Sequence, residues 1–277
     1  MVVDERTEEV VRTDVSSELS VTVLRPTVLE FQISVAHLRG VEVDETLEFT
    51  VDGERVDPTS VVGEHGGRIH RFEAAASQVR AEYRARIAGT PEPAPLDEFH
   101  RSLYLRPSRY AECDKFYGYA AKQFRGIDDE YELLTAIVEF VSERLDYIPG
   151  SSDPIDGATD TLLAAAGVCR DYAHLVIALL RAVKIPARLA AVYAPGCSPM
   201  DFHAVAEALI GDTWYVVDAT GLAPRQSMLR MVTGRDSSDT AFLDNHGGAI
   251  RLDSMTVTAV VAGRLPVDDG RSLVTLG

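Results

Sequence analysis

The chain has 277 residues, of which 46% are hydrophobic and 25% charged. This composition is ordinary for a folded protein and excludes a largely disordered, collagen-like or disulfide-scaffold chain. At about 150 residues per domain, the length predicts a little under two domains. The formal net charge of −16 argues against general binding to nucleic acid or to an anionic membrane, because the field of the protein repels polyanions.

The sequence also limits the cellular compartment. No apolar run approaches the ~20 residues that cross a bilayer, and the acidic start MVVDERTEEVVRTDVSSE lacks the apolar stretch of a signal peptide. The cysteines, Cys113, Cys169 and Cys197, are odd in number and widely spaced, which is not the pattern of a disulfide framework. We therefore expect a cytoplasmic protein that binds neither nucleic acid nor a membrane.

The first third of the chain predicts an antiparallel β-sandwich or barrel. Apolar residues alternate at residues 29–35, 47–51 and 79–87, and Asp52-Gly53 is typical of a tight hairpin turn. We predict an acidic flexible tail at 1–15, a β-domain at 16–90, and a linker at 91–99 within the Pro-rich run GTPEPAPLDE. No residue of this β-domain suggests chemistry.

Beyond the linker, apolar residues first recur at the spacing of helices and then, nearer the C-terminus, at the spacing of strands. We predict an α+β domain at 100–265 and a C-terminal tail at 266–277. Four helices are expected. The first runs from Ser108 to about Phe124, and the second begins at a capping box formed by Asp129 and Glu132. The third runs from Thr159 or Asp160 to Gly167, and the fourth runs from Cys169 until Pro186 ends it. The expected strands lie at 188–194, 203–210, 214–220 and near 255–262. Because the period changes across the linker, the regions 16–90 and 100–265 are expected to have separate cores.

Cys169 is a candidate nucleophile because it opens a predicted helix. The free N–H groups and the dipole at a helix N-terminus favour a thiolate, and they can also hold the oxyanion that forms when a carbonyl is attacked. The alternative is a small buried apolar residue, since free cysteine is among the most buried residue types. The position of Cys169 alone does not separate the two.

His203 and Asp218 lie on the two arms of a predicted hairpin about Gly211-Asp212. A loop of two or four residues pairs Val205 with Asp218, so that His203 and Asp218 become diagonal neighbours on one face, with Cα atoms roughly 7–8 Å apart. The carboxylate would then orient the imidazole and stabilise its charged form. An odd loop would put the two on opposite faces, leaving His203 at the surface and Asp218 as a turn cap.

Three blocks of sequence together resemble a known family. GVCRDYAHLVIALLRAVKIPAR, the His203 block HAVAEAL, and WYVVDAT resemble the transglutaminase-like superfamily of bacterial cysteine peptidases and acyltransferases, over residues 96–225. The family uses a Cys, His, Asp triad in that chain order, which falls here on Cys169, His203 and Asp218, with gaps of 34 and 15 residues. The resemblance implies a papain-like/transglutaminase core of helices on an antiparallel sheet, preceded in some members by a β-rich domain like this one.

Two positions depart from the family pattern. Val205 stands where the family usually has Trp two residues after the histidine, and Ala219 stands where Pro usually follows the acid. Neither replaces an atom of the triad, but both bear on the shape of the substrate groove and the rigidity of the turn.

Several further residues are weaker candidates. We consider Val168, Arg170, Tyr147 and Tyr172 as substrate or oxyanion contacts. Cys169, Cys197 and His203 suggest a zinc site, but no CxxC or HxxxH spacing supports it, so we expect no metal and no cofactor. We expect Asp171 to cap its helix, His174 to pack against a neighbouring element and Cys113 to be inert.

These observations predict a cysteine-dependent amidase or peptidase. Cys169 would attack an amide carbonyl of a peptide or protein, His203 would move the proton, and Asp218 would orient His203. The resemblance favours water over an amine as the acceptor of the acyl group. The main alternative is a non-catalytic peptide-binding module on the same fold, and a zinc-binding domain is the third hypothesis.

Overall fold

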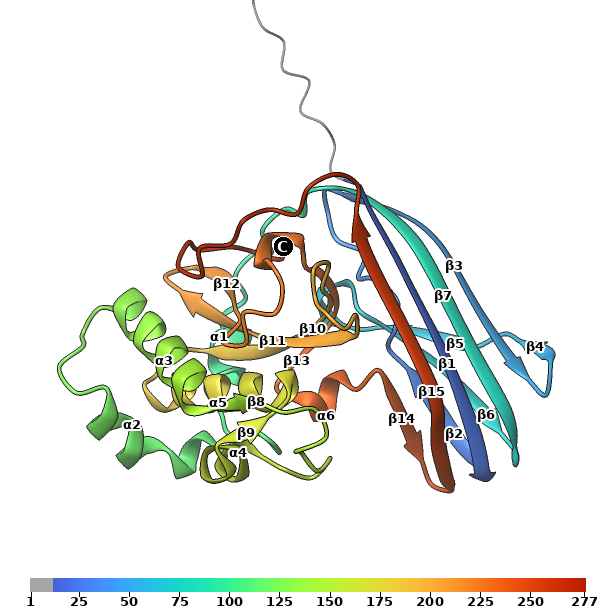
Figure 1. The fold of residues 1–277 in the computed structure, drawn as a ribbon, viewed down its shortest axis with the longest axis horizontal. Helices are drawn as coiled ribbons and strands as arrows, with labels where there is room; N and C mark the ends of the chain where they lie inside the picture. Colours follow the sequence, from blue (N-terminus) through green and yellow to red (C-terminus); the bar gives the residue numbers. More distant parts are fainter. Residues whose placement is uncertain (1–11) are drawn as a thin grey trace, which may run out of the picture.

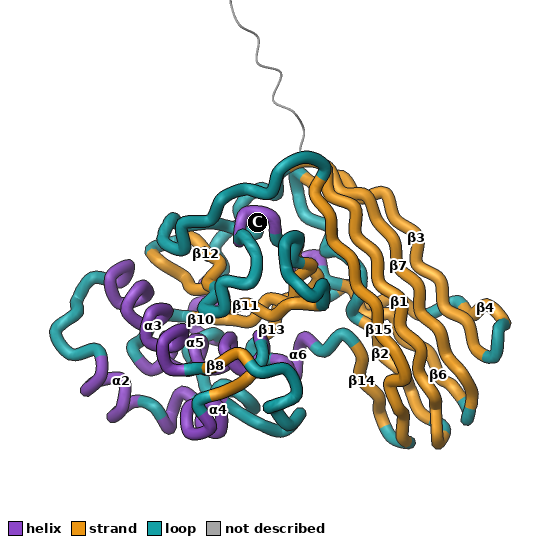
Figure 2. Tube along the Cα trace, in the orientation of Figure 1, coloured by secondary structure: helices purple, strands orange, loops and turns teal. Residues whose placement is uncertain are grey.

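Three antiparallel sheets and a group of helices make up the molecule (Figures 1 and 2). The computed structural model describes residues 12–277. The fold is mixed α+β, as the sequence predicts. Within the described residues, no helix has the length and apolar character needed to cross a membrane.

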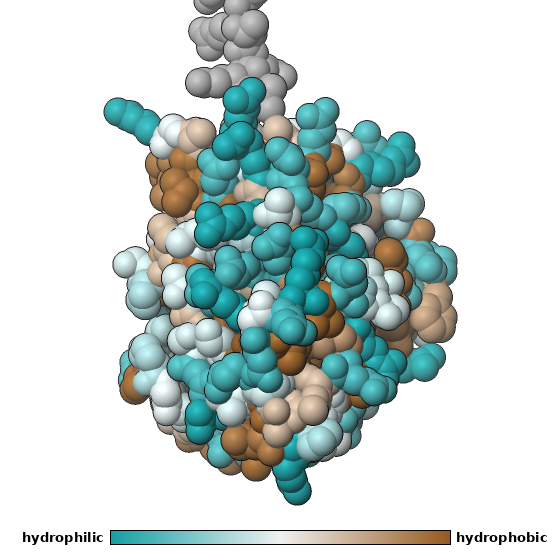
Figure 3. Space-filling view, turned by 90° about the vertical axis from the view of Figure 1, so that its right-hand side faces the viewer, coloured by the Kyte–Doolittle hydropathy of each residue, from teal (hydrophilic) through white to brown (hydrophobic). Residues whose placement is uncertain are grey.

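Two of the sheets pack face to face as a β-sandwich. One has the strand order β15-β1-β7-β3-β4 and the other β14-β2-β6-β5. Their facing residues form one apolar core, while the outward face of the five-stranded sheet is mostly hydrophilic (Figure 3). The strands are β1 (Arg12–Arg25), β2 (Thr27–Phe31), β3 (Val41–Val51), β4 (Glu54–Val56), β5 (Thr59–Val62), β6 (Arg68–Ala74), β7 (Ser77–Gly89), β14 (Leu243–His246) and β15 (Ala249–Val261).

The sandwich takes in more of the chain than the sequence predicts. Strands β14 and β15, assigned from the sequence to the domain at 100–265, pair with β2 and β1 instead (Figure 1). The ladder of β1 and β15 reaches from Thr13–Val261 to Arg25–Ala249, and Val257 and Ala259 complete the sandwich core. The predicted flexible tail at 1–15 is too long at its C-terminal end, because β1 begins at Arg12. The rest of that predicted tail, residues 1–11, lies outside the described residues.

The third sheet, which we term the site sheet, has the order β12-β11-β10-β13. Its strands are β10 (Ala187–Tyr193), β11 (Phe202–Ile210), β12 (Thr213–Val217) and β13 (Leu229–Gly234). A short parallel pair, β8 (Asp146–Tyr147) and β9 (Ala166–Gly167), lies near its helices. The helices are α1 (Glu98–Leu103), α2 (Tyr117–Gln123), α3 (Glu130–Arg144), α4 (Ala158–Ala164), α5 (Cys169–Ala182) and α6 (Ser237–Thr240). Helix α5 is buried along most of its length and packs on β10 and β11.

Local capping signals predict some helices and not others. Asp129 caps α3 by accepting the N–H groups of Tyr131 and Glu132, as expected. The helix predicted from Ser108 is wrong: the chain forms a 3₁₀ turn at Cys113–Lys115 before α2 begins. The hydroxyl of Ser108 accepts a hydrogen bond from buried Arg181 instead of capping a helix. Helix α1 was not predicted, and its first residues fall in the expected linker.

The prediction of two separate cores is wrong for one face of the site sheet, whereas the helices and the other face of that sheet form a core of their own. The sandwich core continues into the site sheet through Ala191 and Tyr193 of β10 and through Met231 and Val232 of β13. The hydroxyl of Tyr193 donates to the carbonyl of Ile33 at 2.8 Å, across the two halves. The predicted tail at 266–277 also packs on the body of the protein, where it buries Leu276.

A fully buried ion network crosses the site sheet. Glu207 of β11 accepts from Arg188 of β10 at 2.7 Å and from Arg230 of β13 at 2.6 and 2.7 Å. All three side chains have no exposed area. The guanidinium of Arg188 also lies 4.1 Å from the ring centre of Trp214 and donates to His65 of the sandwich.

We expect Tyr193→Phe to lower the free energy of unfolding by about 1–3 kcal/mol, because the buried carbonyl of Ile33 and the hydroxyl of Ser17 both lose a partner. The measurement is urea denaturation of the full chain. Tyr131→Phe is the control, since its hydroxyl is exposed and donates to the carbonyl of Arg271. Equal losses in the two variants would contradict a joint core.

Candidate active site

Cys169 is the first residue of α5, as predicted, and its side chain is partly exposed. The start of the helix is fixed by Asp171, whose carboxylate accepts the Val168 N–H at 2.8 Å and the Ser152 hydroxyl at 2.9 Å. Gly167 permits this arrangement, because a Cβ at that position would lie 2.6 Å from the Cβ of Asp171. The buried Asp171 therefore caps the helix, as expected, and sets where Cys169 stands.

His203 and Asp218 form the predicted hydrogen bond. His203 Nε2 lies 2.9 Å from Asp218 Oδ2, and the two side chains are 1% and 2% exposed. Strands β11 and β12 pair from Ile210–Thr213 to Ala206–Val217, so the loop has two residues, the even length that the prediction requires. Asp218 follows the last residue of β12 and reaches His203 from the same face of the hairpin.

Charge and burial act on His203 in opposite directions. Burial lowers the pKa of His203, but the carboxylate of Asp218 and the thiol of Cys169 raise it well above its ordinary value. Burial likewise raises the pKa of Asp218, and His203 and Thr220 bring it below its ordinary value. Since Nε2 is engaged by Asp218, Nδ1 is the ring nitrogen left for Cys169. The arrangement can keep an imidazolium beside a sulfur at neutral pH.

Thr220 holds the second oxygen of Asp218, a role that we did not predict from the sequence. Its hydroxyl donates to Asp218 Oδ1 at 2.7 Å and its backbone N–H donates to the same atom at 2.9 Å. This is a local Asp-x-Thr turn, so the spacing of two residues is the signal that could have identified it. Both oxygens of the carboxylate are therefore fixed.

Cys197 and Tyr147 lie near the nucleophile. Burial, with the charges of Cys169 and Cys197, raises the pKa of Tyr147 to about 12. Burial also raises the pKa of Cys197, which His203 opposes. Within residues 12–277, however, Cys169, Cys197 and His203 do not offer three ligand atoms within 4.8 Å of one another. The geometry does not favour the zinc hypothesis at this site.

The other candidates from the sequence are engaged elsewhere. The N–H of Val168 is bound to Asp171, and the guanidinium of Arg170 binds the Ser152 hydroxyl and the Asp153 carbonyl. The hydroxyl of buried Tyr172 donates to the carbonyl of Leu145 at 2.6 Å. These three residues therefore support the loops around α5. Their contact with a substrate or an oxyanion stays a prediction.

Val205 and Ala219, the two residues that depart from the family pattern, lie in the core of the protein, and so does His174. Val205 is 1% exposed and packs with Val192 and Val216, and Ala219 lies in the core beneath α5. Neither side chain touches the His203–Asp218 pair through a polar group. His174 is fully buried, stacks on Tyr110 and accepts the backbone N–H of Ser237, as expected for a packing role.

Comparisons with known proteins agree with this geometry. The model of the transglutaminase-like superfamily matches residues 117–219. The crystal structure of a candidate cysteine protease from Cytophaga hutchinsonii is 30% identical, covers 95% of this chain and 96% of its own, and has a TM-score of 0.86. The likeness therefore includes the sandwich as well as the site sheet.

Two more distant similarities are found. An uncharacterised protein of Mycobacterium leprae is 25% identical over 164 residues, which are 53% of this chain and 55% of that protein, so the match spans about half the length of this curated relative. The periplasmic domain of TgpA from Pseudomonas aeruginosa is 17% identical over 74% of this chain and 90% of its own, with a TM-score of 0.43.

We expect Cys169 to be the first thiol alkylated by a limiting amount of iodoacetamide at neutral pH. Cys113 and Cys197 are buried, and burial raises the pKa of each. Peptide mapping by mass spectrometry identifies the modified residue, and the urea-unfolded chain is the control in which the preference disappears. Modification of Cys113 or Cys197 first would contradict the assignment of the nucleophile.

We expect Thr220→Val to lower the pKa of His203, because Asp218 loses one hydrogen-bond donor and becomes easier to protonate. NMR titration of the His203 ring measures the change. Thr220→Ser keeps the hydroxyl and should retain the pKa of the wild type. An unchanged His203 titration in Thr220→Val would show that the Thr220 hydroxyl does not act on the pair.

Proposed function

The chain belongs to the transglutaminase-like superfamily, and from this membership we propose that it is a cysteine-dependent enzyme that hydrolyses an amide or peptide bond or transfers its acyl group. The observation that carries the proposal is the buried His203–Asp218 pair, whose imidazole is adjacent to a thiol at the start of α5. Cys169 is among the groups that raise the pKa of His203, so the thiol acts on the imidazole of this pair.

In the proposed first step, the Cys169 sulfur attacks the carbonyl carbon of the substrate as His203 holds the thiol proton. Asp218 keeps the His203 ring oriented through Nε2 and stabilises its positive charge, while Thr220 keeps Asp218 in place. The attack breaks the carbonyl π bond and places a negative charge on the oxygen. That charge forms near the start of α5, where the Cys169 N–H and the helix dipole can stabilise it. The N–H of Val168 is excluded from this role because Asp171 holds it.

In the proposed second step, His203 gives its proton to the leaving amine and the carbon–nitrogen bond breaks. The product is a thioester between Cys169 and the acyl group. Water or a second amine then attacks this thioester, His203 accepts the proton of the attacking group, and the Cys169 sulfur leaves. The choice of acceptor is the whole difference between a hydrolase and an acyltransferase.

We propose water as the main acceptor and a peptide or protein in the cytoplasm as the substrate. The similar protein from Cytophaga hutchinsonii is described as a candidate cysteine protease, which supports hydrolysis. The free state of Cys113, Cys169 and Cys197 is consistent with a reducing compartment. A mixture of casein and dansylcadaverine tests the acceptor: hydrolysis yields new peptides, whereas transfer attaches the fluorescent amine to casein.

We expect Cys169→Ala to reduce the hydrolysis of a fluorogenic peptide-amide library to the uncatalysed background, with a change in stability of no more than about 1–2 kcal/mol. His203→Ala should lose nearly as much activity, because members of a triad act as a unit. Asp218→Asn should lose less, since an amide can hold the ring but not stabilise its charge. The measurement is initial rate against substrate concentration.

Cys113→Ala is the control, because it removes a thiol that lies outside the site. Equal residual rates in the wild type and in Cys169→Ala would overturn the enzyme hypothesis. A non-catalytic peptide-binding module would then be the better account, and binding of the same peptides to Cys169→Ala would identify it.

A further inference from the structure

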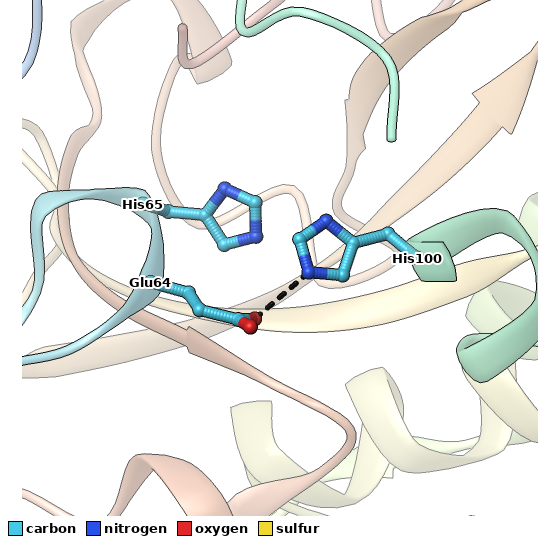
Figure 4. A group of neighbouring side chains, drawn as sticks. All are labelled: Glu64, His65 and His100. Carbon is cyan, nitrogen blue, oxygen red and sulfur yellow. Dashed lines mark hydrogen bonds and ion pairs between the residues drawn. The ribbon is translucent and has the colours of Figure 1, made fainter. Parts of the chain in front are cut away.

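Three metal-ligating side chains meet where the sandwich contacts the site-sheet half of the molecule, away from the candidate active site (Figure 4). Glu64 and His65 lie in the turn Glu64–Gly66 between β5 and β6, and His100 lies on α1. Each offers one ligand atom, and these atoms are all within 4.8 Å of one another. The residues come from segments about 35 positions apart in sequence, so no short motif announces them.

We propose that Glu64, His65 and His100 bind a divalent transition-metal ion, with Zn²⁺ as the best match. Two imidazoles and one carboxylate form a donor set typical of zinc, and water would complete the tetrahedron. Glu64 is exposed and the two histidines are half-buried, so solvent reaches the cluster. The carboxylate has 60% of its surface exposed, and the His100 side chain 12%.

Two of the three ligand side chains already contact each other. His100 Nε2 lies 2.9 Å from Glu64 Oε2, so the ring donates to the carboxylate. The other ring nitrogen, Nδ1, faces the carboxylate of Asp97 at 3.8 Å. Asp97 is itself fixed, since it caps α1 by accepting the N–H of Phe99. At this separation Asp97 adds negative charge beside the His100 ring without a hydrogen bond to it.

The turn that carries His65 has little freedom. His65 adopts a left-handed conformation with φ 54° and ψ 30°, and Gly66 follows with φ 72°. A Cβ on Gly66 would lie 2.3 Å from the carbonyl oxygen of His37, so this glycine is required for the close approach. The His65 ring is thereby kept beside His100, with ring centres 5.1 Å apart. A preorganised pair of imidazoles lowers the entropic cost of binding an ion.

Arg188 would compete with a metal ion for a ring nitrogen of His65. Its Nη1 donates to His65 Nε2 at 3.1 Å, and a metal on that nitrogen would replace this hydrogen bond. Arg188 keeps its ion pair with Glu207 at 2.7 Å and its place over the Trp214 ring without His65. The carboxylates of Glu64 and Asp97 offset the positive charge of Arg188 on the other side of the cluster. The ion would thus tie the sandwich to α1, and its costs are the Arg188–His65 hydrogen bond and the approach of a second positive charge to the buried Arg188.

The test is calorimetric titration of Zn²⁺ into the full chain after treatment with EDTA, in a Cys169→Ala background so that the active-site thiol takes no part. We expect one Zn²⁺ per chain and a melting temperature that rises by about 5–10 °C at a hundredfold excess over Kd. His100→Gln and Glu64→Gln should each weaken binding by about tenfold to a hundredfold or more. Because Glu64 is exposed, its variant should remain folded.

His246→Gln is the matched control. His246 Nε2 pairs with Glu30 at 3.0 Å on the surface of the sandwich, but this pair has no third ligand within the described residues. The control should bind Zn²⁺ as the parent does. Absence of stoichiometric binding, or equal affinities in Glu64→Gln, His100→Gln and the parent, would overturn the proposal. The outcome is independent of the proposed enzyme activity, because the nucleophile is absent throughout.

Discussion

The placement of β11 depends on Glu207, a carboxylate buried between two guanidinium groups. Arg188 comes from β10, which pairs with β11, and Arg230 comes from β13, on the far side of β10. Neither has another acid to neutralise it within the site sheet. Removing one partner of such a buried pair typically costs 3–5 kcal/mol, and a slip of one residue would turn Glu207 to the opposite face. The same register places His203 opposite Val192 and brings it beside Asp218.

Local signals in the sequence predicted the parts of the site that are close together in the chain. Helix α5 begins at Cys169 because Gly167, Val168 and Asp171 form a cap within five residues, and the hairpin follows from a two-residue turn. The hydrogen bonds of Arg170 could not be predicted, because they depend on Ser152 and Asp153, which lie 18 and 17 residues earlier in the chain. Only the folded loop brings Ser152 and Asp153 to the start of α5.

The sequence patterns did not predict which strands pair when those strands lie far apart in the chain. The alternation in residues 255–262 predicts a strand but not its neighbour, and its partner β1 lies at the other end of the chain. The buried charges of Arg188, Glu207 and Arg230 likewise read as ordinary polar positions of solvated strands. Only their meeting in the interior explains why strands that bury both faces carry charges at all.

The pairing of β15 with β1 has a consequence for biosynthesis. On the ribosome, β1, β2, β3, β6 and β7 emerge first, but β1 remains an open edge until residues 249–261 have left the exit tunnel. The whole site sheet is synthesised in the interval, so it can form before the sandwich beneath it is closed. During translation, the exposed ladder of β1 is a surface on which a neighbouring nascent chain could add a strand, and chaperones that cover such edges would have their greatest effect at that stage.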